Sequence, residues 1–539
     1  MKLLDFFNLE SDVPKKQMIF TALVSGLANG YLLMLINKSA EAVNRGEEIQ
    51  TQNFLLFLLD LILLIYTKQY ALKQATFTVE DAINRVRIRV ADKLRHVELP
   101  YIETAGHANI YSRITQDSSL ISESAIILIN ACQQLIVVVI CLLYVAWLSI
   151  PGFILTTCVL GSSVLMYLYN SNRVSTQLHD VSNKESEFFN GIKSILVGFK
   201  EIKINRKKND ALFTHIETVS KEAKDLKVAT GLNFIIELMF AQTSFYVLCA
   251  SIIFILPILS TTNVDQVVGI TIAVLFLFGP LSMVVSAFPL FARANVAVEN
   301  IYYLEHEIDL ASKEISLTKS KAPVFETMEF EQVTFNYPPQ NEGISFSIGP
   351  LNLKLNQGEI LFIVGGNGSG KSTLLKLLTG LYYPTSGNIY LNNKPLLASD
   401  YIHCRELYST IFTDFHLFER LYGIENIDEK RVEVLLKTMK LEKKTTFKNE
   451  RFLNTDLSTG QKKRLAYIAS VLEDKQIYIF DEWAADQDPE FRQYFYEVLL
   501  KDLKAKGKTV IAVSHDDRYF SSADRVIKIE YGQILNSSV

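Results

Sequence analysis

Long runs of apolar residues fill the chain up to about residue 291, and charged segments separate them. A helix that crosses a membrane needs about 20 mostly apolar residues, because lipid offers no partners for backbone N–H and C=O groups. Residues 1–311 are therefore expected to form an α-helical membrane domain. We predict six spans, at residues 18–36, 54–72, 125–148, 152–169, 234–256 and 267–291.

The connections between these spans alternate in length and charge. Three are short and together carry only Lys38 and Arg45 as basic residues, whereas residues 73–124 and 170–233 are long, rich in lysine and arginine, and helical in pattern. Basic residues stay on the cytoplasmic side during insertion. We therefore predict that the two long excursions, both termini and everything after residue 311 are cytosolic.

One acidic residue, Asp60, stands inside the second apolar run. An ionised carboxylate at membrane depth is costly unless it faces water or a polar partner. Asp60 is therefore a candidate residue of the transport path, and pairing with a neighbouring polar side chain is the alternative.

The apolar pattern stops at residues 312–325, which are rich in Ser, Lys and Pro and which we interpret as a linker. From 326 to 539 short apolar runs alternate with helical segments, which is typical of an α/β domain with a parallel sheet. A hydrophobic content of 49% and a mean hydropathy of +0.17 exclude an ordinary soluble enzyme as the leading class. The net charge of −4 gives no reason to expect a nucleic-acid partner.

The second domain contains a phosphate-binding loop, GGNGSGKS, between an apolar strand at 359–364 and a helix at 372–382. Glycines let the backbone N–H groups turn around phosphate oxygens at a helix N-terminus, whose dipole favours anions. The lysine is expected to reach the β and γ phosphates, and Ser372 to offer its hydroxyl to Mg²⁺. The residues predicted to contact ATP here are Gly365, Gly366, Asn367, Gly368, Ser369, Gly370, Lys371, Ser372 and Thr373.

Two further apolar strands end in chemically useful residues. QIYIFDE places Asp481 and Glu482 after a buried strand at 477–480, and TVIAVSH at 509–515 ends on His515. Asp481 can hold the metal ion through water, and Glu482 can act as the general base for the water that attacks the γ phosphate. His515 is expected to contact that phosphate.

The sequence LSTGQ, which precedes Asp481 and Glu482 in the chain, resembles the LSGGQ signature of ABC transporter ATPases. Its residues are Leu457, Ser458, Thr459, Gly460 and Gln461. Tyr337 is similar to the aromatic residue that stacks on adenine in this family, and Asp488 in AADQDP to the aspartate of its D-loop. The six spans with two long cytoplasmic excursions resemble the membrane domain of a type I half-exporter. The resemblance therefore covers nearly the whole chain.

The resemblance implies a dimer. In this family ATP lies between the phosphate loop of one subunit and the signature of another, and this chain carries one of each, so we expect a homodimer with two competent sites. It also implies short coupling helices near 107–113 and 206–213. These would transmit the ATP-driven closure of the two ATPase domains to the membrane helices, so that a central cavity opens alternately to the inside and the outside.

One position departs from the family pattern. Where a glutamine usually stands in the Q-loop, this chain has Thr413 or Asp414, within the segment FTDFHLF. That segment, together with DEWAADQDP, is similar to the exporters of cyclic peptides and siderophore peptides, including the pyoverdine type.

We therefore predict an ATP-driven, Mg²⁺-dependent exporter of a peptide-like or siderophore-like product, in a bacterial-type cytoplasmic (inner) membrane. Two other functions stay open: a flippase for membrane lipid or another amphiphile, and a membrane-anchored ATP-dependent switch without net transport.

Overall fold

The computed structural model describes residues 5–6, 9–10, 15–44, 46, 51–106, 110–111, 113–259, 264–312, 323–337 and 346–535. Its contacts divide the chain into two compact units. Unit 1 comprises Met1–Val97 and Ala105–Ser312, and unit 2 comprises Glu98–Thr104 and Lys313–Val539.

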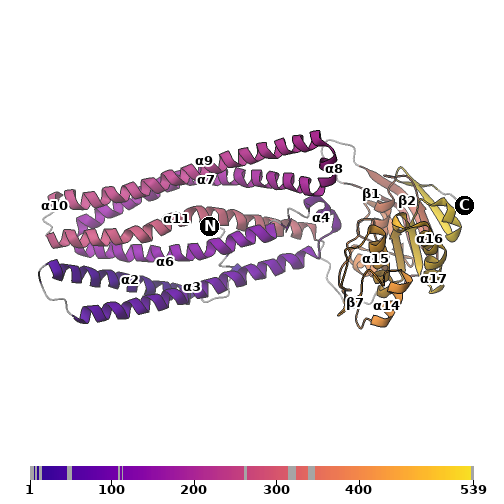
Figure 1. Ribbon diagram of the computed structural model, residues 1–539, viewed down its shortest axis with the longest axis horizontal. Helices are drawn as coiled ribbons and strands as arrows, with labels where there is room; N and C mark the ends of the chain where they lie inside the picture. The colour runs from indigo at the N-terminus through magenta and orange to yellow at the C-terminus, as the bar shows by residue number, and fades with distance from the viewer. Residues whose placement is uncertain are drawn as a thin grey trace. The chain divides into compact units, whose positions relative to one another are not determined.

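Unit 1 is built from long helices that lie side by side in pairs, α2 with α3, α6 with α11 and α7 with α9 (Figure 1). Short helical segments interrupt or extend them: η1 (Arg113–Asp117), α8 (Phe199–Ile204), η2 (Ser251–Ile255) and α10 (Leu256–Leu259). The long helices are α2 (Lys15–Asn44), α3 (Thr51–Leu94), α6 (Ser118–Leu148), α7 (Ile150–Val197), α9 (Arg206–Ala250) and α11 (Val264–Ala311).

The expectation of a helical membrane domain is confirmed. Within the described residues, four helical stretches are long and apolar enough to cross a membrane: Thr51–Leu94, Arg113–Leu148, Arg206–Ile258 and Gln266–Ala311. They contain four of the six predicted spans. A shorter apolar stretch, Ile150–Ser162, lies where the predicted fourth span begins, and α2 covers the predicted first one.

Four of the described helices of unit 1 continue far beyond the length of a bilayer. Helices α3, α7, α9 and α11 have 44, 48, 45 and 48 residues, which corresponds to about 66–72 Å at 1.5 Å per residue. The charged residues that flank the apolar runs are therefore mostly parts of the same helices, because backbone hydrogen bonding along a helix does not depend on the polarity of its side chains.

Close packing in unit 1 depends on small residues. A Cβ added to Gly26 or Gly30 of α2 would lie 2.5 Å from Ile136 Cγ2 or 2.4 Å from Ile140 Cγ2 of α6. Glycine lets the two helices approach, as is common where helices pack in a membrane.

Unit 2 has the predicted α/β architecture. Its central sheet has six strands in the order β12-β11-β3-β10-β9-β6, and all neighbours except β11 and β12 are parallel. These strands are β3 (Ile360–Val364), β6 (Tyr408–Ile411), β9 (Ile477–Asp481), β10 (Thr509–Val513), β11 (Arg525–Glu530) and β12 (Gln533–Leu535). Both faces of the sheet are covered by apolar clusters, so the central strands are buried.

A second, antiparallel sheet has the order β2-β1-β4-β5. It consists of β1 (Thr327–Asn336), β2 (Ser347–Asn356), β4 (Ser386–Leu391) and β5 (Lys394–Pro395), and a two-stranded hairpin of β7 (Phe447–Lys448) and β8 (Arg451–Phe452) stands apart. The helices of unit 2 are α4 (Leu99–Ala105), whose last residue belongs to unit 1, α12 (Lys371–Leu378), α13 (Tyr401–Arg405), α14 (Glu429–Thr438), α15 (Thr459–Glu473), α16 (Pro489–Tyr494) and α17 (Leu500–Ala505).

Candidate nucleotide-hydrolysis site

The site lies where the parallel strands β3, β9 and β10 end, since the carboxyl ends of neighbouring parallel strands meet at one edge of a sheet. The phosphate loop follows β3, Asp481 is the last residue of β9, and His515 comes two residues after the end of β10. Strand β10 is thus shorter than the predicted strand, which ended on His515. The histidine lies in the loop after the strand and takes no part in the hydrogen bonding of the sheet.

The phosphate loop needs glycine at three positions. Gly368 and Gly370 have φ of +74° and +106°, values that residues with a Cβ rarely adopt. A Cβ on Gly365 would lie 2.2 Å from the carbonyl oxygen of Ile529. These glycines therefore give the loop its shape, as expected for a backbone that wraps a phosphate group.

The polar groups of the loop fit a triphosphate. The Lys371 side chain is buried, and its ammonium group donates hydrogen bonds of 3.1 and 3.0 Å to the carbonyl oxygens of Gly365 and Gly366. The buried Ser369 hydroxyl has no hydrogen-bond partner within the described residues, and Ser372 is exposed. Buried polar groups normally have partners, so a phosphate oxygen would satisfy the Ser369 hydroxyl, and the positive charge of the Lys371 ammonium group would attract the same phosphates.

Asp481 and Thr413 meet beside the loop. Burial raises the pKa of the Asp481 carboxyl above its ordinary value, and hydrogen bonds from the side chain and backbone of Thr413 oppose that shift. Of the two Q-loop candidates, the structure thus brings Thr413 to the predicted metal-binding carboxylate. Asp414 is exposed at the next position.

Glu482 and His515 form a pair. Oε1 of Glu482 lies 3.0 Å from Nε2 of His515 and 4.0 Å from Nζ of Lys371. Both residues line a cavity of about 300 Å³. Glu482 has the left-handed φ of +49°, an unusual conformation for a residue with a Cβ that often marks functional sites.

The signature residues start helix α15. Ser458 is its N-cap, and a reciprocal pair of hydrogen bonds joins Ser458 and Gln461, with N···O distances of 3.4 and 3.2 Å. Leu457 is buried, whereas Ser458 and the neighbouring Thr459 are exposed. Gly460 has no space for a side chain, because a Cβ there would lie 2.5 Å from the backbone oxygen of Asp486.

Asp488 caps the following helix, α16. It accepts a hydrogen bond of 2.9 Å from the backbone N–H of Phe491 and forms an ion pair of 2.6 Å with Arg464. The N–H of Phe491 and then the Arg464 guanidinium lower the pKa of this carboxyl. The predicted D-loop residue is thereby tied to the signature helix of its own chain.

Tyr337 follows β1 and belongs to an aromatic cluster. Its hydroxyl lies 3.1 Å from Oγ1 of Thr373, and its ring contacts Phe335 and Tyr382 at centroid distances of 5.1 and 5.7 Å. The tyrosine therefore lies beside the helix that carries the phosphate loop, and its stacking on adenine stays a prediction.

Four polar contacts that sequence reasoning missed lie within unit 2 and involve its segment Glu98–Thr104. Glu98 accepts hydrogen bonds from Arg405 at 3.0 Å and Tyr383 at 2.7 Å, and Glu103 from Lys376 at 2.7 Å and Tyr382 at 2.5 Å. Residues 107–109 and 112 of the expected coupling segment near 107–113 lie outside the described residues, so that segment stays a prediction; the contacts that the structure describes come from 98–104. The two acids of the stretch ELPYIET were the available signal.

Asp60 lies far from this site in the sequence, on helix α3. Its side chain is 6% exposed, and its Oδ2 has no hydrogen-bond partner within the described residues. The carboxylate therefore lies on the packed side of the helix, and its role in a transport path stays a prediction.

Fold and site together define a P-loop ATPase domain that shares a chain with long membrane helices. A sequence profile described as "ABC transporter" matches residues 348–485. The chain is 30% identical over 538 residues to the ATP-binding protein SyrD of Pseudomonas syringae pv. syringae, a match that covers 96% of this chain and 93% of that protein. The chain belongs to the ABC transporter family.

Other relatives match only the ATPase part. EcfA1, an energy-coupling factor transporter ATP-binding protein of Mycoplasma mobile, is 32% identical over 222 residues, 39% of this chain and 79% of that protein. Among solved structures, a bacterial Atm1-family ABC exporter with ATP bound has a TM-score of 0.79 at 16% identity, over 97% of this chain and 95% of that one. This similarity shows the exporter fold over nearly the full length.

The main expectations are thereby confirmed. The chain is an ATP-driven ABC exporter of the half-transporter type, an integral membrane protein whose ATPase domain binds ATP and is coupled to transport.

Proposed function

We propose that two copies of this chain form an exporter that moves a peptide-like or siderophore-like product out of the cytoplasm, across an inner membrane, with both termini cytosolic. The observation that carries the cargo class is the pair of segments FTDFHLF and DEWAADQDP. The first contains Thr413, which contacts Asp481, so the unusual Q-loop belongs to the working site.

The chemistry of ATP hydrolysis follows from the site geometry. The backbone of the phosphate loop and Lys371 hold the β and γ phosphates, and Ser372 and Asp481 are the residues that would hold Mg²⁺. When bound, this ion neutralises charge that develops on the phosphates. Glu482 accepts a proton from the attacking water, and His515 orients its carboxylate through their 3.0 Å contact.

The distribution of site residues supports a homodimer. In this family, ATP lies between the phosphate loop of one chain and the signature of the other. The exposed Ser458 and Thr459 are therefore expected to contact ATP that is bound at the phosphate loop of a different chain. A second chain supplies that ATP. Each dimer then contains two identical composite sites.

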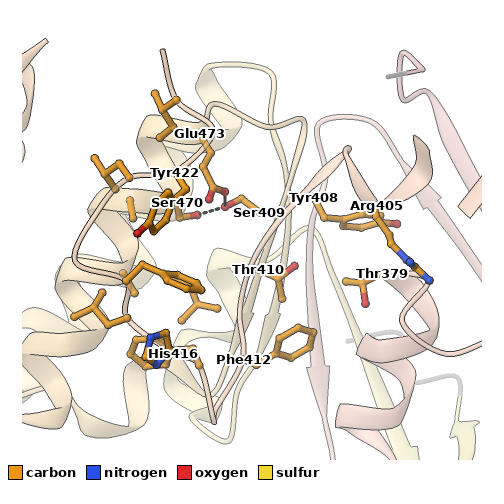
Figure 2. A pocket seen from close by; sticks show the side chains of 18 of the residues that line it. Thr379, Arg405, Tyr408, Ser409, Thr410, Phe412, His416, Tyr422, Ser470 and Glu473 are labelled. Atoms are coloured by element: carbon orange, nitrogen blue, oxygen red, sulfur yellow. Dashed lines mark hydrogen bonds between the residues drawn. The ribbon is translucent and has the colours of Figure 1, made fainter. Parts of the chain in front are cut away.

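A groove in unit 2 supports the same proposal. It has a volume of about 480 Å³ and is lined by aromatic and aliphatic side chains, among them Phe412, Phe415 and Tyr422. Figure 2 shows Ser409, Ser470 and Glu473 pointing toward one another along one wall; Ser409 contacts Ser470 at 2.8 Å and donates a hydrogen bond to Glu473. This wall is satisfied internally, so the apolar part of the groove is what a partner would occupy.

The tip of the second excursion exposes apolar side chains that the apolar part of the groove could bury. Around α8, large apolar side chains are exposed, with Val197 at 77% and Ile204 at 87%, and basic residues such as Lys203 lie between them. The expected coupling segment near 206–213 is the first part of the long helix α9, and the short helix before it is α8. We propose that α8 of the second copy docks into the groove of the first. Each ATPase unit would then hold 98–104 of its own chain and α8 of its partner.

The test is ATP hydrolysis by the purified protein in lipid nanodiscs, titrated with cyclic and siderophore-type peptides, with Glu482→Gln as the blank. Saturable stimulation supports peptide export. A response to lipid headgroups instead of peptides would favour a flippase. Stimulation by a ligand that never accumulates in inside-out vesicles would favour a switch. A Glu482→Gln protein that hydrolyses at the wild-type rate would contradict the general-base role.

A further inference from the structure

Lys463 is a buried cation outside every motif that the family resemblance assigns a role. It lies on the signature helix α15, five residues after Ser458, and it is 2% exposed. A buried ammonium group is costly unless it is fully paired. Its Nζ donates a hydrogen bond of 2.7 Å to the backbone oxygen of Glu482 and forms an ion pair of 2.7 Å with Asp486.

The hydrogen bond to Glu482 holds an uncommon backbone conformation. Strand β9 ends at Asp481, and Glu482 turns out of the strand direction with a φ of +49°. A left-handed conformation is unfavourable for a residue with a Cβ, so surrounding contacts must hold it. Lys463 holds the backbone oxygen of Glu482, while His515 contacts its carboxylate.

The same helix holds the rest of the segment that follows β9. The indole N–H of Trp483, a fully buried residue, donates a hydrogen bond of 2.8 Å to the backbone oxygen of Lys463. Arg464 binds Gln487 at 2.8 Å, and Gln487 donates in turn to the backbone oxygen of Gly460 at 3.0 Å. Among these contacts, Lys463 is the one that reaches Glu482 itself.

We propose that Lys463 is a positioning residue for hydrolysis: it fixes the backbone of Glu482 and so places the carboxylate that activates water. Helix α15 also carries the exposed signature residues, which are proposed to contact ATP bound to the second chain. Lys463 therefore connects this helix to Glu482, the general base for ATP bound to its own chain. The proposal rests on the role proposed for Glu482.

The test compares Lys463→Met with Lys437→Met, a matched control at an exposed position of α14. Full-length proteins in nanodiscs are assayed for ATP affinity, for the number of bound nucleotides, and for kcat per bound nucleotide. We expect Lys463→Met to lower kcat at least tenfold, with KM and ATP affinity within twofold of the wild type, and the control to change none of these. Counting bound nucleotides removes the effect of any unfolded fraction.

A second comparison asks whether Lys463 acts through Glu482. In the Glu482→Gln background, Lys463→Met should cause no further loss of residual hydrolysis, because the carboxylate it positions is gone. A further tenfold loss there, or a kcat of Lys463→Met within twofold of the wild type, overturns the proposal.

Asp486→Asn covers the case in which Lys463→Met does not fold, since the Asp486 side chain is 45% exposed. It removes the charge that anchors the Lys463 ammonium group and should lower kcat at unchanged KM. An unchanged kcat in this variant would overturn the proposal. Failure of Glu482 as the base would show separately, as wild-type hydrolysis by Glu482→Gln alone.

Discussion

Thr413 shows how one side chain can take over a position usually held by a longer one. A glutamine reaches its target through two methylene groups and an amide. Thr413 has a hydroxyl directly on Cβ, and its side chain and backbone both hydrogen-bond to the buried Asp481. The shorter residue therefore requires that the loop itself approach strand β9.

Removing this hydroxyl should weaken the metal site. In Thr413→Val the buried Asp481 loses a hydrogen-bond donor, which costs about 1 kcal/mol when one such bond is removed, and we expect the Mg²⁺ concentration for half-maximal hydrolysis to rise severalfold. Thr413→Ser, which keeps the hydroxyl, is the control and should stay near the wild-type value. Equal Mg²⁺ dependence of Thr413→Val and wild type would show that the hydroxyl has no such role.

Residues whose function depends on local conformation could be predicted from the sequence. Gly368 and Gly370 stand where the phosphate loop requires left-handed φ values, and the spacing of these glycines from Lys371 carries that requirement. The role of Lys463 could not be predicted, because it depends on contacts with Glu482 and Asp486 that form only when α15 packs beside β9.

At the scale of elements, the start of helix α15 and the segment after β9 behave as one part. Gly460 approaches the backbone of Asp486 too closely for any side chain, and Arg464 holds both Gln487 and Asp488. A displacement of the signature helix would therefore move the D-loop with it. The left-handed Glu482 lies at the other end of the same segment.

Gly460→Ala tests this close packing. The new Cβ would lie 2.5 Å from the backbone oxygen of Asp486, and overpacking of this kind costs about 1–3 kcal/mol. We expect a fall of at least tenfold in ATP hydrolysis with nucleotide binding retained, together with a lower melting temperature of the ATPase unit. Gly231→Ala on α9, where an added Cβ meets open space, is the matched control. Wild-type hydrolysis by Gly460→Ala would mean that α15 and the D-loop separate without consequence.

Element boundaries were predictable to different degrees. Strands β3, β9 and β10 are short buried apolar runs and lie close to the predicted ranges. The helix ends around the membrane spans were harder to predict, because α3 and α7 continue beyond their apolar residues and α9 begins well before its own. The hydropathy of the side chains indicates which part of a helix lies in lipid. The ends of the helix are determined by backbone hydrogen bonding and lie at other residues.

For the whole molecule, the proposed dimer makes a prediction about mixtures. Lys371→Ala and Ser458→Ala should each abolish most hydrolysis alone, since each damages both composite sites of a homodimer. A mixed dimer has one site with both changes and one with neither. Mixing the two proteins before reconstitution should therefore restore up to about half the wild-type rate per mixed dimer. A mixture as inactive as its components would contradict the shared sites.

The contacts of α4 predict a separation of hydrolysis from transport. Glu103→Ala removes the acceptor of Lys376, which lies on the phosphate-loop helix α12, and of Tyr382. We expect basal hydrolysis within twofold of the wild type, and loss of most of the stimulation by peptide. The control is Glu217→Ala, an exposed residue of α9 that pairs along its own helix with Lys221. Full peptide stimulation in Glu103→Ala would remove α4 from the coupling path.

The segment Glu98–Thr104 also bears on how such proteins can be recombined. It belongs to the ATPase unit in space, although it interrupts the membrane unit in the chain, and Glu98 pairs with Arg405 across 307 residues of sequence. A hybrid exporter spliced at the linker would inherit its docking acids from one parent and the basic residues that receive them from the other. Exchange of domains between relatives should therefore succeed most often when residues 98–104 are transferred together with the ATPase domain. The acids and the basic residues that bind them then come from the same parent.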